Sequence, residues 1–176
     1  MKTRFILSLT ALFFACSVLL ISLFTATLAS SSGSHVLTSK KLYFGKDILP
    51  DNIMYPVLMA VDRVELETAP SSEQIYIQIE YANRRLNYAQ QLVDQQKEAL
   101  AVSTITKAEN YLADAAAKVA GDKETTQTVK EDLSRAIQYH IDELRKINPK
   151  LTDANRVSID KLIEQNTFTL KTLQSP

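Results

Sequence analysis

The side chains best suited to chemistry are few and scattered in this chain of 176 residues. The two histidines are His35 and His140, the single cysteine is Cys16, and the three lie in different parts of the sequence. A metal or catalytic centre needs several such groups to converge. We therefore assign no catalytic or metal-binding residue. Because His140 stands beside Ile141 at the edge of an apolar stripe, we expect it to be a hydrogen-bonded structural histidine.

Motifs for cofactor binding and for nucleophilic catalysis are missing from the sequence. The chain has only three glycines and contains no glycine-rich phosphate loop, no nucleophile elbow and no HExxH helix. Its 20 basic residues balance its 20 acidic ones, so its net charge favours neither nucleic acid nor an anionic surface. We expect no cofactor, no nucleic-acid partner and no enzymatic activity.

Tyrosines and arginines are the remaining candidates for a binding surface. Tyr81 and Tyr88 are seven positions apart and therefore share one face of a helix. They are either an amphipathic rim of the core or a surface for a partner, because tyrosine is enriched at interfaces. Arg84 and Arg85 lie between them, although adjacent charged residues usually occupy a solvated helix face. The candidate interaction surface consists of Tyr81, Arg84, Arg85 and Tyr88.

The elements that position these residues are predicted to be helices, because apolar residues recur every three or four positions. One stripe begins after Tyr55 and ends near Thr68, since the residue before Pro70 is disfavoured in a helix. The next stripe changes phase near residues 94–98, which predicts a hairpin turn there. The stripes are Val57, Val61 and Val64; Ile75, Ile79, Ala82, Leu86, Ala89 and Val93; and Ala101, Ile105, Ala108, Leu112, Ala115 and Val119.

Two further helices are predicted after Gly121, which suits the residue that follows a helix. Pro149 ends the first of them, and the second begins at Thr152 or Asp153. Capping boxes are predicted at Ser71 with Gln74 and at Thr128 with Glu131, with Asp122 as an alternative, earlier start of the second helix. The expected buried residues are Leu133, Ile137, Ile141, Leu144 and Ile147, then Ile159, Leu162 or Ile163, Leu170 and Leu173. Narrow stripes must share a core, so the fold class is all-α: a bundle of about five helices with a long α-hairpin.

The N-terminal segment predicts export. Lys2 and Arg4 precede an uncharged run over residues 5–29, long enough to span a bilayer, and the basic end should stay in the cytoplasm. We expect a single-pass membrane anchor with an extracytoplasmic C-terminal part. The alternative is a signal peptide cleaved after Ala29, which would release a secreted protein. Lipid attachment at Cys16 is disfavoured because the apolar run continues beyond it.

The predicted organisation has four parts. Residues 1–29 form the signal or membrane segment, and 30–44 form a flexible linker rich in serine. Residues 45–120 form a helical module with the hairpin, and 121–176 a C-terminal helical pair that completes the bundle. In the junction from Leu49 to Pro56, Asp51 or Asn52 is expected to accept amides and Pro56 to begin a helix.

Two motifs in order, LPDNIMYP and ANRRLNYA, carry a family resemblance. The chain resembles a bacterial family of exported helical domains of unknown function, domain of unknown function 5667, over roughly residues 45–120. That family is similar in its Leu-Pro-Asp/Gly-x-x-x-Tyr-Pro motif and in its Ala-x-x-Arg-Leu-x-x-Ala motif, but it carries a glycine in the hairpin turn. The resemblance implies an exported helical module and no reaction. The matching residues are Leu49, Pro50, Asp51, Tyr55, Pro56, Ala82, Arg85, Leu86 and Ala89.

These observations together predict a membrane-tethered, extracytoplasmic helical module that acts through an unidentified protein partner or the cell envelope. The membrane contact would be made by residues 5–29, and the sequence leaves the oligomeric state open. The alternative is an envelope-stress chaperone or ligand-binding protein released by signal cleavage. It draws on residues 151–165, LTDANRVSIDKLIEQ, which are similar to segments of small periplasmic stress chaperones, with Asn155 in place of glutamine.

Overall fold

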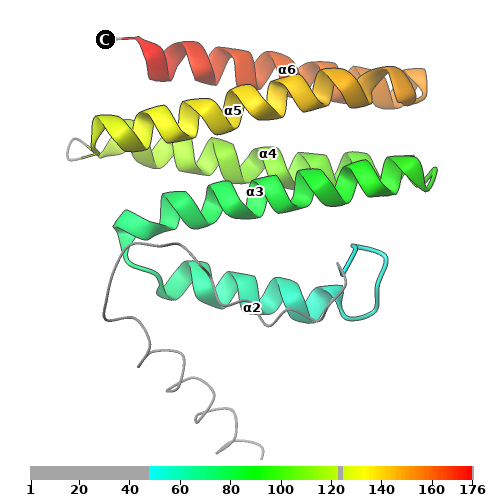
Figure 1. The fold of residues 1–176 in the computed structure, drawn as a ribbon, viewed down its shortest axis with the longest axis horizontal. Coiled ribbons are helices and arrows are strands. Elements are labelled where there is room, and N and C mark those ends of the chain that lie inside the picture. The colour runs from blue at the N-terminus through cyan, green and yellow to red at the C-terminus, as the bar shows by residue number, and fades with distance from the viewer. Residues whose placement is uncertain (1–47, 123–124, 176) are drawn as a thin grey trace, which may run out of the picture. The chain divides into compact units, whose positions relative to one another are not determined.

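The described part of the chain is entirely helical. A computed structural model describes residues 48–122 and 125–175, all of which belong to one compact unit, Phe44–Pro176. No strand occurs in these residues, and the five α-helices confirm the predicted fold class for this part of the chain (Figure 1). The elements are α2 (Tyr55–Thr68), α3 (Ser71–Asp94), α4 (Glu98–Gly121), α5 (Gln127–Ile147), the 3₁₀ turn η1 (Asn148–Lys150) and α6 (Asp153–Gln174).

The predicted membrane or signal segment, residues 1–29, and the predicted linker, residues 30–44, lie outside the described residues. So do Cys16 and His35. Among the helices that the structure does describe, none combines the length and the apolar character that crossing a membrane requires. The predictions made for residues 1–44 therefore stay predictions.

Four helices form an up-down-up-down bundle. The hairpin α3–α4 lies beside the hairpin α5–α6, and α4 contacts both helices of the second hairpin (Figure 1). Helix α2 is not part of this bundle and packs chiefly against α3. Two extended residues, Ala69 and Pro70, separate α2 from α3. The fold is therefore a bundle with one additional helix on its outside.

The turn between α3 and α4 lies where the change of phase predicted it. Helix α3 ends at Asp94, and Gln96 takes the left-handed conformation with φ of 60°. The amide of Lys97 donates to the carbonyl of Leu92 at 2.8 Å, and the amide of Gln96 donates to Val93 at 2.9 Å. This pair of bonds is the Schellman arrangement that satisfies the last carbonyls of a helix. A glutamine here occupies a conformation that glycine adopts at lower cost.

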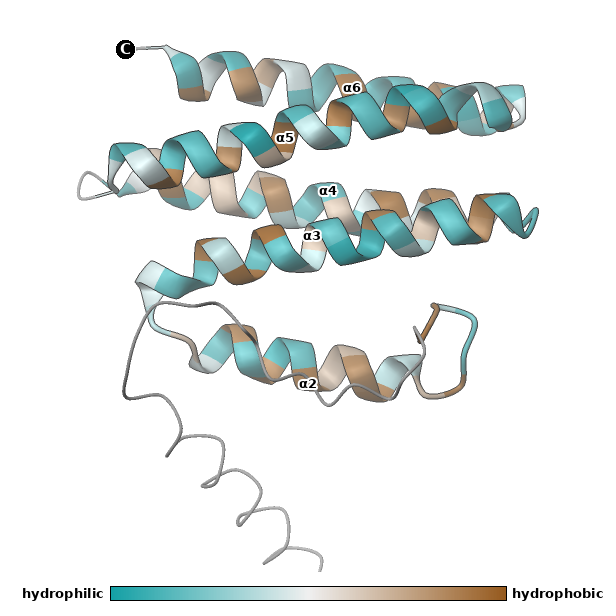
Figure 2. Cartoon of the chain, in the orientation of Figure 1, coloured by the Kyte–Doolittle hydropathy of each residue, from teal (hydrophilic) through white to brown (hydrophobic). Residues whose placement is uncertain are grey.

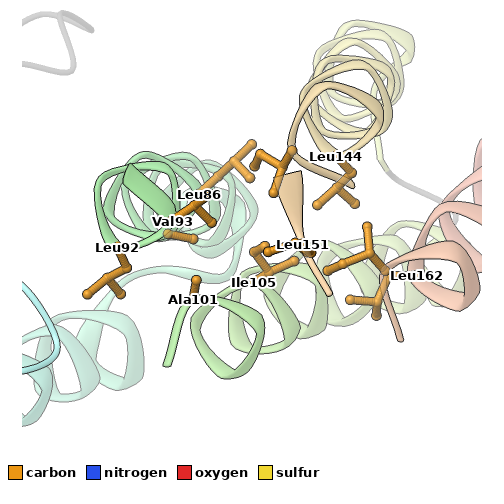
Figure 3. Close-up of a cluster of buried hydrophobic side chains, with 11 residues drawn as sticks. Leu86, Leu92, Val93, Ala101, Ile105, Leu144, Leu151 and Leu162 are labelled. Carbon is orange, nitrogen blue, oxygen red and sulfur yellow. The ribbon is translucent and has the colours of Figure 1, made fainter. Parts of the chain in front are cut away.

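The core consists of two apolar clusters. One surrounds the α3–α4 turn and includes Leu86, Ile105 and Leu144 (Figure 3). The other lies toward the start of α3 and includes Leu112 and Leu133. Apolar bands along α3 to α6 alternate with hydrophilic ones, as their helical period requires (Figure 2). All predicted core residues of α3, α4 and α5 are buried except Ile79, which is half-buried; on α6, Ile159 and Leu162 are buried while Ile163, Leu170 and Leu173 are half-buried.

Both predicted capping boxes are wrong, although the helices they marked exist. Helix α3 already includes Ser71, which therefore cannot cap it, and the Gln74 amide donates to the Ala69 carbonyl at 3.0 Å. Helix α5 begins two residues earlier than the box at Thr128 requires. Its cap is Thr126, whose hydroxyl accepts from the amide of Val129. In α3 the first-turn amides of Glu73 and Gln74 donate to the Pro70 carbonyl, which makes Pro70 the N-cap. In α5 a second threonine, Thr126, takes the capping position.

Helix α2 has the predicted bounds but not the orientation expected of a core helix. Val57, Val61 and Val64 share one face, yet they are 54%, 53% and 40% exposed. The buried residues of α2 are Tyr55 and the charged Asp62. Helix α2 thus turns toward the bundle a mixed face centred on Asp62 and leaves its valines uncovered in the described structure, because Asp62 and Glu65 meet complementary groups on α3.

Candidate functional site

The contact between α2 and α3 is built from polar and charged side chains. The carboxylate of Asp62 pairs with the guanidinium of Arg84, and both side chains are largely buried. The hydroxyl of Tyr81, on the same helix as Arg84, lies 3.0 Å from the Asp62 carbonyl and 2.7 Å from Glu65 Oε2. These bonds replace the apolar packing that usually attaches an outer helix.

Arg85 lies beside this ion pair inside a set of aromatic side chains. Its guanidinium carbon lies 4.5 Å from the ring centroid of Tyr111 and 5.8 Å from that of Tyr81. The Tyr81 and Tyr111 rings meet edge to face with centroids 5.8 Å apart. A cation over the face of a tyrosine ring is attracted by the ring quadrupole, and this attraction is stronger where water is excluded. Arg85 is therefore held in a well-defined position.

Two tyrosines at this contact, Tyr81 and Tyr55, have a raised pKa. Burial raises the pKa of the Tyr81 hydroxyl, and its hydrogen bond to Glu65 and the charge of Asp62 raise it further. Burial also raises the pKa of Tyr55, although the nearby Arg85 and Arg84 act in the opposite direction. Neither hydroxyl is an activated nucleophile or base at neutral pH.

A pocket of about 350 Å³ opens between α2, α3 and α4 next to Arg85. Its lining contains three cationic side chains, Arg63, Arg85 and Lys107, and the ring of Tyr111. Leu66 and Asn110 also line it, together with two carboxylates, Glu67 and Asp114. Glu67 is paired with Arg63 at 2.7 Å. The pocket lies at the lower end of the size range of small-molecule sites.

The predicted interaction residues lie inside the protein. Tyr81, Arg85 and Tyr88 are buried, and Arg84 is partly buried through its pair with Asp62. The structure thus brings Tyr81, Arg84 and Arg85 together in the contact with α2. Their role toward another molecule stays a prediction. Asp62, Glu65 and Tyr111 also belong to the cluster. Of these three residues only Tyr111 could have been predicted from the sequence, because its position across the hairpin matches that of Arg85.

The residues of the two sequence motifs serve the junction and the core. Asn52 Oδ1 accepts from the amide of Met54 at 2.9 Å, as expected of an Asp-Asn turn before a helix. Asp51 pairs with Lys97 at 2.5 Å and so links this junction to the α3–α4 turn. Of the remaining motif residues, Leu49 and Pro50 are half-buried, Pro56 is exposed, and Tyr55, Ala82, Leu86 and Ala89 are buried.

A second set of polar side chains forms a hydrogen-bonded layer that joins all four helices of the bundle. His140 Nδ1 lies 2.8 Å from Glu109 Oε1, and its Nε2 lies 3.1 Å from Asn83 Oδ1. The amide of Asn166 donates to Glu109 Oε2 at 2.6 Å. The prediction of a hydrogen-bonded His140 is confirmed, whereas its partners on three other helices left no signal in the sequence. On α4 and α6 this layer lies between the two apolar clusters.

The start of α6 is attached to the start of α4 through Glu98. Its Oε2 accepts from the amide and the hydroxyl of Thr152, both at 2.9 Å, and from the Asn155 amide at 3.0 Å. The bond from the Thr152 backbone, followed by those from the Asn155 and Thr152 side chains, lowers the pKa of Glu98. Asn155 thus has a structural contact in this chain. No set of three metal-ligating side chains converges anywhere in residues 48–122 and 125–175.

Comparisons with known proteins identify one family. A family model described as "Domain of unknown function (DUF5667)" matches residues 47–154. The match begins just before the α2 junction and ends at the start of α6, so it takes in α5, which the resemblance seen in the sequence did not include. No curated protein and no solved structure matches the chain.

Proposed function

The chain belongs to the DUF5667 family of domains of unknown function, and we propose that it is a membrane-tethered, extracytoplasmic module that binds a helix of a partner protein through α2. The tether in this proposal is the apolar run at residues 5–29, preceded by Lys2 and Arg4. We also propose that the protein lies in a bacterial membrane and that the Leu-Pro-Asp/Gly-x-x-x-Tyr-Pro motif marks the start of the domain. One observation carries the binding function: the apolar face of α2, which none of the described residues covers.

The spacing on this face fits a helix better than an extended peptide. Met54, Val57, Val61 and Val64 follow one another at intervals of three, four and three, and each is exposed. This is the spacing of a coiled-coil seam, which buries its residues between those of a facing helix. An exposed stripe of this kind on a soluble domain marks an interaction site. We call the four residues the α2 seam.

The charged residues of α2 bear on which surface the α2 seam can meet. Asp62 and Glu65 are engaged by α3, and the exposed Arg63 and Glu67 form an ion pair with each other. The exposed side of α2 therefore presents no cluster of basic residues, whereas helices that lie on lipid surfaces are rich in Lys and Arg. A partner helix with an apolar seam and flanks of low net charge complements α2 in both respects.

Site-specific crosslinking tests this proposal. A photoreactive amino acid at position 61 of the full chain, in its native membranes, should yield one protein adduct whose crosslinked peptide is an amphipathic helix. A probe at Val157, an exposed valine on α6, is the matched control and should not yield this adduct. Replacing Val57 and Val64 by lysine should abolish the adduct, while the bundle keeps its melting temperature because neither valine is in the core.

Three results would contradict the proposal. The first is an identical set of adducts from positions 61 and 157. The second is an adduct with the mass of two copies of this chain, which would make the α2 seam a dimer contact. The third is crosslinking of position 61 to lipid alone, which would place α2 on the bilayer surface.

A further inference from the structure

Arg85 is a buried cation without a carboxylate partner in the described structure. Only 3% of the residue is exposed. Its Nη1 contacts the Tyr81 carbonyl at 3.3 Å, and its Nη2 contacts Met59 Sδ at 2.7 Å and the Tyr111 hydroxyl at 3.4 Å. Its Nε has no hydrogen-bond partner. None of these partners carries a formal negative charge, whereas the neighbouring Arg84 has Asp62.

Such a guanidinium is costly to bury unless something compensates it. Desolvating a charge is unfavourable unless an opposite charge or hydrogen bonds compensate it, and a buried polar atom without a partner calls for an explanation. The two tyrosine rings offset part of this cost through cation–π attraction. They leave the planar N–H fork of the guanidinium without an anionic acceptor, and that fork is suited to carboxylate and phosphate groups.

The pocket beside Arg85 has the lining that an anion would need. Lys107 and Arg85 line it from neighbouring helices of the hairpin, and Asn110 adds an amide. Of its two carboxylates, Glu67 is already paired with Arg63. Asp114 lines the same pocket, but it forms no ion pair with Arg85 among the interactions of the described residues. The cationic side of the pocket is therefore available to a bound ligand.

We infer that this pocket binds a small oxyanion, a carboxylate or phosphate group, between the guanidinium of Arg85 and the ammonium of Lys107. The apolar side chain of Leu66 and the Tyr111 ring would contact the remainder of a ligand that carries such a group. The inference does not depend on the proposed function, because the α2 seam consists of other residues of α2. A helix partner and an anionic ligand would occupy different faces.

The experiment titrates the full ¹⁵N-labelled chain, in a non-ionic detergent, with sodium phosphate and separately with sodium acetate at constant ionic strength set by chloride. Binding should shift the Arg85 Nε–Hε resonance and the amide resonances of Asn110 and Tyr111 with saturation. For so small a ligand the expected Kd is roughly millimolar. Saturation by phosphate alone indicates a phosphoryl ligand, and saturation by acetate indicates a carboxylate.

Arg85→Met would remove a buried side chain and can unfold the chain. Variants of surface residues are therefore used, because they test binding without disturbing the fold. Lys107→Gln should weaken binding about tenfold, as expected when a charge-assisted contact is lost. Asp114→Asn should tighten binding, since it removes a competing negative charge from the pocket. Lys161→Gln, at an exposed lysine of α6, should leave the affinity unchanged. Shifts that fail to saturate with both anions, or that are the same in the Lys107 and Lys161 variants, would overturn the inference.

Discussion

The carboxylate of Asp62 on α2 accepts a hydrogen bond from the guanidinium of Arg84 on α3, and this ion pair is the centre of the contact between the two helices. Water is largely excluded from both side chains. Removing one member of such a pair leaves the other charge buried and unpaired, which is the costly situation for a buried ion pair.

Asp62→Ala should therefore cost roughly 3 kcal/mol in the free energy that holds α2 on the bundle. Because α2 contributes little to the apolar core, the expected result is release of α2 and not global unfolding. Amide exchange in α2 should accelerate while amides in α4 and α5 stay protected. Asp94→Asn, which breaks the exposed pair with Lys150, is the control and should change exchange little. Uniform acceleration in all helices would contradict this prediction.

The buried layer around Glu109 predicts a loss of global stability. Each Glu109 oxygen makes a separate hydrogen bond, Oε2 with the Asn166 amide and Oε1 with His140 Nδ1. Leucine is of similar size but has no polar atom in its side chain, so Glu109→Leu leaves both partners unsatisfied. The free energy of unfolding in urea should fall by about 2 kcal/mol. Glu164→Gln, at an exposed position of α6, should have almost no effect, and equal effects of the two variants would refute the role of the layer.

The turn residue Gln96 offers a stabilising substitution. Its φ of 60° is costly for a residue with a Cβ atom. Gln96→Gly should raise the free energy of unfolding by about 1 kcal/mol, measured by thermal or urea denaturation. Gln95 has a negative φ of −87°, so Gln95→Gly should bring no such gain. A loss of stability in the Gln96 variant would mean that its side chain makes a contact that outweighs the backbone strain.

The contact of Glu98 with the start of α6 should depend on pH. Folding lowers the pKa of Glu98 below its ordinary value of 4.5, first through the Thr152 amide. A group with a lowered pKa stabilises the fold at pH above its unfolded pKa, and this contribution is lost as the pH falls through the folded value. The stability difference between the wild type and Glu98→Gln should thus be constant from pH 7 to about 5.5 and shrink below pH 4.5.

The measurement is the midpoint of urea denaturation of the wild type and of Glu98→Gln between pH 7 and pH 3. The same comparison with Glu164→Gln supplies the control, because that carboxylate does not contact α6's first turn. A difference between the wild type and the Glu98 variant that persists unchanged at pH 3 would show that the charge of Glu98 is not what attaches α6.

The bundle helices could be predicted from the sequence because their cores are regular. The stripe from Ala101 to Val119 alternates steps of four and three without interruption, and all of its members are buried. Such a stripe has one energetically acceptable solution, which is to face the other helices. The turn at Gln96 followed from the change of phase alone, although no glycine or proline marks it.

The orientation of α2 and the composition of the site could not be predicted in the same way. Periodicity shows that Val57, Val61 and Val64 share a face, but not whether that face is covered. The choice depends on Asp62 meeting Arg84, a contact between residues 22 positions apart. Likewise, Glu109 finds His140 and Asn166 only after the helices have assembled, and single-sequence patterns do not encode such pairs.

The extended Ala69–Pro70 link has a mechanical consequence. A load that enters from the N-terminal side of residue 48 reaches the bundle through the exposed Asp51–Lys97 ion pair and through α2. After that pair breaks, the polar contacts of α2 would give way in sequence from Tyr55 toward Pro70, before the apolar clusters of the bundle open. Pulling on the chain from residue 48 should register α2 as a separate event at low force, before the bundle yields. Under tension from the N-terminal side, α2 would detach first, and the bundle would stay folded.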